Sequence, residues 1–351
     1  MAENLALIAG ATGAAASRLT ELLAATPGWR VVGLCRRPPS ERTSPTLRYI
    51  ATDLLDPESC RAAVAQAGAV THFVYSARSP FGEGGVEDVP SNVAMLRNML
   101  DAVESPALHH VHLVEGAKWY GVHIGPIRSP AREDDPRHMS PNFYYDQQDL
   151  LAERRRGKAW SWSASRPQYL VDVAPGRPRN LVTVIGAYAA ICRELGVAFD
   201  FPGKPGAYTT LAENTDCTVL AHFIRWAITE PRAADQAFNI NNGDVYRWCN
   251  FWPRLAAYFR LPPGIIRPMS LERWMADKQP VWARIAERHG LRFSELAKLA
   301  LWAYGDYVFA IDRDVMQSMT RARLAGFTLV EDSEDQFIRH LDAYRELKVL
   351  P

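Results

Sequence analysis

Near its N-terminus the chain reads Leu5-Ala6-Leu7-Ile8-Ala9-Gly10-Ala11-Thr12-Gly13-Ala14-Ala15-Ala16, and this stretch decides the fold. Its apolar first half predicts a β-strand, and residues 17–25 are compatible with a helix. A Gly-x-x-Gly-x-x-Ala turn in that position is typical of dinucleotide binding, because glycines allow a tight turn and a close approach to a pyrophosphate at a helix N-terminus. An ordinary glycine turn is the alternative. We predict that the dinucleotide is bound by Gly10, Thr12, Gly13, Ala14 and Ala15.

Further apolar runs alternate with helix-compatible segments for more than a hundred residues, which predicts an α/β fold with a doubly wound parallel sheet. The expected later strands are 29–35, 47–51, 70–75, 111–114, 160–165 and 237–241. The expected later helices are 92–103, 144–152, 181–195, 216–229 and 248–259. We predict a dinucleotide-binding Rossmann domain over residues 1–170, with a returning segment near 210–245. Residues 171–209 and 246–351 form a smaller, mostly helical substrate-binding domain in this prediction.

The end of the second expected strand indicates the type of dinucleotide. Enzymes that use NAD usually place an acid there for the ribose 2′-hydroxyl, whereas this strand is followed by Arg36 and Arg37. Two guanidinium groups can bind a 2′-phosphate by bidentate hydrogen bonds, so NADP(H) is the predicted cofactor. A solvated basic turn is the alternative. The residues expected beside the adenine, the pyrophosphate and the nicotinamide ribose follow later strands and are Asp53, Leu54, Ser76 and Ala77.

Two side chains suggest the chemistry. Lys118 is the first lysine in the chain and follows the expected strand at 111–114, and Tyr144 begins an expected helix. A phenol can donate to an oxygen that gains charge, and a nearby ammonium lowers the phenol pKa. The Tyr-x-x-x-Lys spacing of short-chain dehydrogenases is absent, because Gln148 follows Tyr144 by four residues and Asp149 follows Tyr145 by four. Core aromatic rings beside a surface lysine are the alternative interpretation.

Composition excludes several other classes of function. The 351 residues carry a net charge of +1, which offers no global attraction to nucleic acid or to an anionic membrane. Five dispersed cysteines lack metal-site spacing and indicate reduced thiols. No basic leader precedes the first strand, and the longest apolar run, 181–192, is too short to span a bilayer. We therefore expect a soluble cytoplasmic protein without a metal, and leave open whether it forms a homodimer.

The sequence resembles atypical extended short-chain dehydrogenases of the progesterone 5β-reductase/iridoid synthase type. Residues 116–121 are similar to the family's Gly-x-Lys-x-Tyr motif, and residues 142–149 to its Asn-Phe-Tyr-Tyr-x-x-Glu-Asp motif. Weaker similarities over residues 239–252 and 318–327 extend the resemblance across the chain. The resemblance implies NADPH-dependent reduction of a carbon–carbon double bond conjugated to a carbonyl. In this scheme Tyr144 holds the carbonyl oxygen of a small hydrophobic substrate, and Lys118 supports the phenol; both also contact the cofactor.

The chain departs from the family pattern at four positions. Glu115 replaces a small hydroxyl residue, Gln148 replaces an acid, Ile124 replaces a phenylalanine and Tyr169 replaces an asparagine of the plant members. We expect Glu115 to be a helix-capping or solvated carboxylate, with a second acid–base group as the alternative. The candidate substrate contacts are Tyr120, Ile124, Tyr145 and Tyr169.

Three other functions remain open from the sequence. The same tyrosine serves 1,2-reduction of an aldehyde or ketone, because both reactions need a donor to the same oxygen. A non-catalytic dinucleotide-binding protein is the second, although the lysine and tyrosine argue against it. A sugar-nucleotide epimerase is the third and weakest, because such enzymes normally keep the Tyr-x-x-x-Lys spacing.

Overall fold

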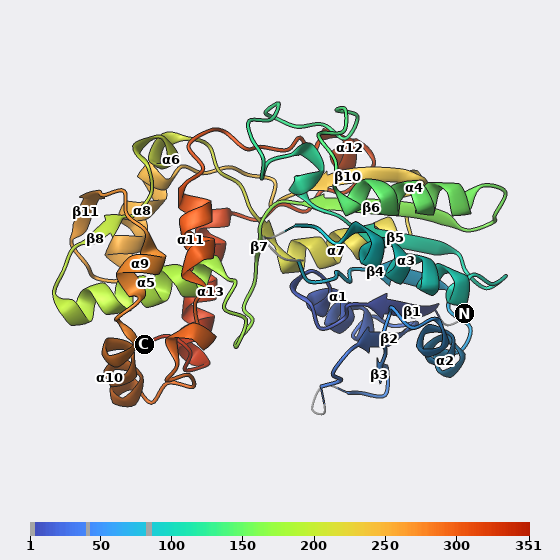
Figure 1. Ribbon diagram of the computed structural model, residues 1–351, viewed down its shortest axis with the longest axis horizontal. Coiled ribbons are helices and arrows are strands. Elements are labelled where there is room, and N and C mark those ends of the chain that lie inside the picture. Colours follow the sequence, from blue (N-terminus) through green and yellow to red (C-terminus); the bar gives the residue numbers. More distant parts are fainter. Residues whose placement is uncertain (1–3, 40–42, 82–85) are drawn as a thin grey trace. The chain divides into compact units, whose positions relative to one another are not determined.

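Figure 1 shows the computed structural model of the chain, which describes residues 4–39, 43–81 and 86–351. The chain divides into two compact units. The first unit comprises residues 1–169, 217–241 and 317–329, and the second comprises residues 170–216, 242–316 and 330–351. Both units are therefore built from segments that are distant in the sequence.

A seven-stranded sheet forms the centre of the first unit, in the order β10-β6-β5-β4-β1-β2-β3. Every neighbouring pair is parallel, which confirms the predicted doubly wound fold. The strands are β1 (Asn4–Ala9), β2 (Trp29–Cys35), β3 (Leu47–Ala51), β4 (His72–Tyr75), β5 (His110–Val114), β6 (Ser161–Pro167) and β10 (Gln236–Ile240). Strand order reverses between β1 and β4, so the chain leaves these two strands in opposite directions and opens a crevice at their carboxyl ends.

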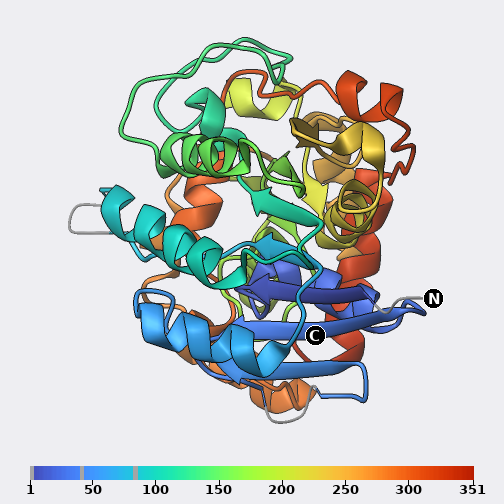
Figure 2. The same ribbon diagram turned by 90° about the vertical axis from the view of Figure 1, so that its right-hand side faces the viewer.

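Helices cover both faces of this sheet (Figure 2). Helix α1 packs against α7, and α3 packs against both α2 and α4. The helical elements of the unit are α1 (Ala14–Ala24), α2 (Pro57–Ala67), α3 (Val89–Val103), α4 (Phe143–Arg155), α7 (Cys217–Ala227) and α12 (Thr320–Leu324), with the 3-10 turns η2 (Ala117–Tyr120) and η3 (Pro231–Ala233). Helix α2 was not predicted from the sequence, because its alanine-rich sequence has few large apolar residues.

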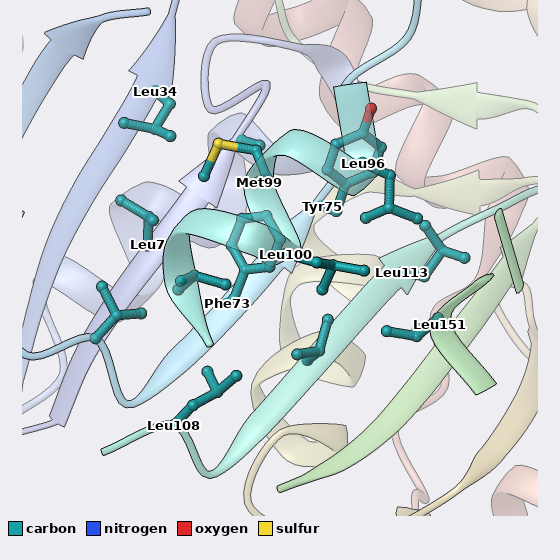
Figure 3. Close-up of a cluster of buried hydrophobic side chains, with 14 of the residues drawn as sticks. Leu7, Leu34, Phe73, Tyr75, Leu96, Met99, Leu100, Leu108, Leu113 and Leu151 are labelled. Carbon is teal, nitrogen blue, oxygen red and sulfur yellow. The ribbon is translucent and has the colours of Figure 1, made fainter. Parts of the chain in front are cut away.

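The core beneath α2, α3 and α4 is a continuous set of buried apolar side chains (Figure 3). Leu7, Phe73 and Leu113 come from three neighbouring strands, and Leu96 and Leu100 come from α3; all five are fully buried. Burying each such side chain contributes about 1.5–3 kcal/mol. This packing fixes the strand ends that carry the candidate site.

The second unit is mostly helical. Its elements are β7 (Leu170–Val171), α5 (Leu181–Leu195), β8 (Phe199–Phe201), α6 (Pro205–Thr209), β9 (Thr215–Asp216), α8 (Trp248–Tyr258), β11 (Pro263–Ile266), α9 (Leu271–Met275), α10 (Gln279–His289), η4 (Leu296–Lys298), α11 (Trp302–Phe309) and α13 (Ser333–Glu346). Aromatic rings fill its interior, where Phe199 stacks on Trp252 with ring centroids 4.4 Å apart. No helix in the described ranges is both long enough and apolar enough to cross a bilayer.

Candidate active site

The glycine turn lies where the strand order of the first unit reverses. Gly10 follows β1 with a φ of +78°, and a Cβ there would come within 2.9 Å of the Ser76 carbonyl carbon and oxygen. Gly13 precedes the first residue of α1, and its N–H donates to the Gly10 carbonyl at 2.8 Å. The turn therefore presents backbone to the crevice, as a bound pyrophosphate requires, and brings Gly10 next to Ser76 and Ala77.

The other candidate cofactor residues follow neighbouring strands at the same edge of the sheet. Arg36 and Arg37 are exposed directly after β2, and Asp53 and Leu54 follow β3. The Asp53 carboxylate accepts a hydrogen bond from the Leu55 N–H at 2.9 Å and so shapes this turn. Within the α1 segment, Thr12 lies in the glycine turn and Ala14 and Ala15 begin the helix, all three partly buried.

Lys118 and Tyr144 lie beside one another after β5. The Lys118 Nζ is 6.0 Å from the centroid of the Tyr144 ring and 5.5 Å from that of Phe143. A Cβ on Gly116 would be 3.3 Å from the Tyr144 hydroxyl, so the absence of a side chain there makes room for the phenol. Tyr144 is partly exposed, as a group that meets a substrate needs to be.

The side chains of Asn142 and Glu87 connect Lys118 to the start of α4, the helix that carries Tyr144. Asn142 donates from Nδ2 to the Lys118 carbonyl at 2.9 Å and accepts from the Tyr144 N–H at 3.2 Å. Glu87 forms an ion pair with Lys118 through one oxygen, and its other oxygen accepts from the Phe143 N–H at 3.3 Å. Glu87 was not among the predicted site residues, because it belongs to no motif and lies 31 residues before Lys118.

The four candidate substrate contacts occupy different environments. Tyr145 is buried and donates to the Trp119 carbonyl, and Tyr120 is buried and donates to Asn239. Both hydroxyls thus have protein partners. Ile124 is 53% exposed, and Tyr169 is partly buried. The structure therefore separates two packed rings from two side chains that remain accessible.

The expectation for Glu115 was wrong, because this carboxylate neither caps a helix nor meets solvent. Its side chain is fully buried, and Oε2 accepts from the Nε of Arg166 at 2.8 Å. Burial raises the pKa of Glu115 to about 7, against the opposing effect of the Arg166 guanidinium. Gln148, the other departure nearby, accepts from Arg166 Nη2 at 3.1 Å. Both departures therefore face one buried arginine.

The sheet order, the glycine turn and the adjacent lysine and tyrosine define an oxidoreductase of the extended short-chain dehydrogenase/reductase type. A short-chain dehydrogenase/reductase superfamily protein from Agrobacterium tumefaciens, solved with bound NAD, has the same fold with a TM-score of 0.66 at 17% identity, covering 98% of this chain and 97% of its own. The model of the PRISE-like Rossmann-fold domain matches residues 52–351, and the chain belongs to this family.

Curated relatives agree with this assignment. An (S)-8-oxocitronellyl enol synthase from Nepeta cataria is 33% identical over 365 residues, which cover 99% of this chain and 94% of the relative. A 3-oxo-Delta(4,5)-steroid 5-beta-reductase from Arabidopsis thaliana is 32% identical over 368 residues, with the same coverage of 99% and 94%. The protein is therefore an oxidoreductase of the short-chain dehydrogenase/reductase type, as the resemblance of its two motifs implied.

Proposed function

We propose that this protein is an NADPH-dependent reductase of carbon–carbon double bonds conjugated to a carbonyl. The observation that carries the proposal is the hydroxyl of the partly exposed Tyr144 beside Gly116, with the Lys118 ammonium near the same ring. The names of the steroid 5-beta-reductase and the enol synthase support an enone or enal as the substrate class. The second unit is the proposed substrate-binding domain, and the cytoplasm the proposed location.

The proposed reaction assigns one task to each side chain. NADPH held at the Gly10–Ala15 turn would supply the hydride for the β-carbon, while the electrons of the double bond move toward the carbonyl oxygen and solvent protonates the α-carbon. Tyr144 donates a hydrogen bond to that oxygen while the oxygen gains negative charge. The Lys118 ammonium supports the phenol and stabilises the negative charge by its own positive charge. One preorganised donor of this kind is worth about 3–4 kcal/mol of barrier lowering.

The residues present fit a dinucleotide with a 2′-phosphate. Gly10 leaves room where a Cβ would meet the Ser76 backbone, and the N-terminus of α1 faces the same crevice edge, which suits a pyrophosphate. Arg36 and Arg37 are exposed at the end of β2, within the region where the ribose of such a cofactor lies. Their charge supports NADPH over NADH.

A substrate screen tests the proposed function. NADPH oxidation is followed with small enals, cyclic enones and the matching saturated aldehydes and ketones, and each product is identified. We expect saturated carbonyl products from the enals and enones. Allylic alcohols, or turnover of the saturated carbonyls alone, would instead establish 1,2-reduction. No oxidation with any of them would refute reductase activity toward this substrate class.

The assignment of the donor predicts different results for two adjacent tyrosines. Tyr144→Phe removes the hydroxyl of the partly exposed ring, so kcat should fall about 100- to 1000-fold while NADPH affinity stays within about twofold. Tyr145→Phe removes the buried hydroxyl that donates to Trp119, so it should lower thermal stability more than kcat. If Tyr145→Phe lowers kcat more than Tyr144→Phe, the wrong ring has been chosen.

A further inference from the structure

A single buried guanidinium contacts several of the segments near the proposed catalytic pair. Arg166, near the end of β6, is only 1% exposed. It donates to the Glu115 carboxylate at 2.8 Å, to the Tyr120 hydroxyl at 3.1 Å and to the Gln148 side-chain oxygen at 3.1 Å. It also donates to the Glu133 carbonyl at 3.1 Å, and its Cζ lies 3.6 Å from the centroid of the Trp119 ring. We call these six residues the Arg166 cluster.

The contacts to Gln148, Trp119 and Tyr120 reach the two elements that carry the proposed catalytic groups. Gln148 is four residues after Tyr144, so the two side chains lie one turn apart on the same face of α4. Trp119 and Tyr120 directly follow Lys118 in η2. The Arg166 cluster therefore joins α4, which carries Tyr144, and η2, which carries Lys118, to the ends of β5 and β6.

The backbone next to Glu115 borders the phenol and lies close to the backbone next to Arg166. A Cβ built on Gly116, the residue after Glu115, lies 3.3 Å from the Tyr144 hydroxyl and 3.6 Å from the carbonyl oxygen of Pro167, the residue after Arg166. A shift of either strand end would therefore move the surface against which this hydroxyl rests. Such a shift is costly for catalysis, since a misplacement of about 1 Å can lower a rate about a hundredfold.

Charge explains why the cluster holds its geometry. A buried guanidinium is costly unless a carboxylate and further hydrogen bonds satisfy it, and removing one partner of such a pair is strongly unfavourable. Glu115 supplies the carboxylate, with its side chain fully buried, and the neutral Gln148 completes the set from α4. Only one carboxylate, from the β5 side, thus faces this guanidinium within hydrogen-bond distance among the described residues.

We propose that Arg166, paired with Glu115, is a positioning residue that fixes Tyr144 relative to Lys118 by holding α4 and η2 to the ends of β5 and β6. The kinetic part of this inference rests on the proposed function. Arg166 contacts neither the lysine ammonium nor the tyrosine hydroxyl in any described hydrogen bond, so its effect reaches the reaction through the elements it joins.

Relocating the carboxylate tests the proposal. Glu115→Gln removes the charge without changing the shape, and Glu115→Gln with Gln148→Glu returns a carboxylate to the same guanidinium from α4. The control is Arg154→Gln, which breaks the ion pair of Arg154 with Glu104 at the other end of α4. We measure kcat with an enone, NADPH affinity by fluorescence titration, and hydrogen exchange of residues 116–121 and 143–150.

We expect Glu115→Gln to lower kcat about tenfold to a hundredfold, to change NADPH affinity less than about twofold, and to speed exchange in both segments. The double variant should recover kcat to within about threefold of the original, and the control should leave both readouts unchanged. Unchanged kcat and exchange in Glu115→Gln, or no recovery in the double variant, would overturn the positioning role. If Glu115→Gln does not fold, Gln148→Ala replaces it, with a loss of about tenfold in kcat expected.

The exchange measurement separates the two proposals. If the original protein reduces none of the substrates, the proposed function fails. In that case faster exchange in 116–121 and 143–150 after Glu115→Gln, reversed by Gln148→Glu, still establishes that the cluster positions these segments. Unchanged hydrogen exchange in these segments would then overturn the positioning role of Arg166 and Glu115.

Discussion

Among single residues, burial distinguishes the two adjacent tyrosines of α4. Helical geometry places consecutive side chains about 100° apart, so Tyr144 and Tyr145 must face different surroundings. Tyr145 packs edge-on against Trp119, with ring centroids 4.8 Å apart, and Tyr144 lies over Gly116 and near Lys118. Glu87 and Asn142 then each connect Lys118 to the first turn of α4. The site is thus defined by pairwise contacts that no single motif contains.

The pairing of Glu87 predicts an effect on catalysis. Glu87→Gln removes the charge that pairs with Lys118 and weakens the acceptor for the Phe143 N–H, so kcat should fall about fivefold to fiftyfold. The adjacent Asp88→Asn is the matched control, because Asp88 accepts from the Ser91 N–H at the start of α3. This control should change stability little and leave kcat unchanged, because asparagine caps a helix about as well as aspartate. Equal kcat values for the two variants would contradict a role for Glu87 in the site.

The two arginines after β2 predict cofactor preference. Replacing Arg36 and Arg37 together by alanine removes two bidentate donors to a 2′-phosphate, so the KM for NADPH should rise at least about tenfold. The KM for NADH should change less than about twofold, because NADH lacks that phosphate. Steady-state kinetics with both cofactors measures this. Equal changes would remove the assignment of these residues to the 2′-phosphate.

Among the elements, β5 and β6 carry an unusual polar layer. Ser161, His110, Ser163, His112 and Ser165 form a chain of hydrogen bonds of 2.7–3.0 Å between the two strands. Its histidines are buried, and the His112 ring is 6.3 Å from the Phe223 ring of α7. His alternates with Val and Leu in β5, a sequence pattern typical of a strand with one face in solvent. Helices cover both faces of this parallel sheet, so the histidines are buried instead. The serines satisfy the imidazoles there.

This polar layer predicts acid sensitivity. Burial lowers the pKa of His112 to about 3 and lowers the pKa of His110 as well. Burial also lowers the pKa of His72, in the neighbouring strand β4, to about 4. The unfolded chain binds protons below pH about 6.5 that the folded chain excludes, so stability is complete above pH 6.5 and is lost as pH falls toward these values. Between pH 7.5 and 5 the loss should be on the order of 2 kcal/mol per histidine.

Denaturant unfolding at several pH values measures this loss. His112→Gln keeps hydrogen-bonding capacity without a titrating group, so it should lower the dependence of the unfolding free energy on pH. An exposed histidine gives the control: His289→Gln, in the last turn of α10, should leave the dependence unchanged. If His112→Gln also leaves it unchanged, the buried imidazole is not the source of the acid sensitivity.

On the scale of the whole molecule, both compact units are assembled from distant segments. The first unit takes β10 and α7 from residues 217–241 and α12 from residues 317–329, so its sheet is complete only after most of the chain is in place. The side-chain oxygen of Asn239 in β10 accepts a hydrogen bond from the Tyr120 hydroxyl, and Gln317 donates one to the Arg166 carbonyl at 3.1 Å. Residues 217–241 and 317–329 thus hydrogen-bond to Tyr120 and Arg166, two residues near the candidate site.

Cofactor binding should stabilise the folded protein as a consequence. A ligand that binds only the folded state at about 100 times its Kd adds about 2.7 kcal/mol to the unfolding free energy. NADPH should therefore raise Tm by several degrees, and NADH at the same concentration should raise it less. Differential scanning calorimetry measures both shifts. No shift with NADPH, or a larger shift with NADH, would contradict the proposed cofactor.

Local pattern alone determined much of this protein. The period of apolar residues, the glycine turn and the length of the helices predicted the parallel sheet, and β2, β3 and α5 have the predicted bounds. The family was predicted from the resemblance of residues 116–121 and 142–149 to two of its motifs. These features depend on neighbours in the sequence, which is why they can be read from it.

Tertiary structure alone decided which charges meet. Glu115 pairs with Arg166 across 51 residues, and Lys118 pairs with Glu87 across 31, so neither pair follows from spacing. Glu115 appeared solvated from its sequence because carboxylates are rarely buried without a partner, and the partner comes from the adjacent parallel strand. Long-range contacts of this kind depend on strand order and on burial, which arise only when the whole sheet has formed.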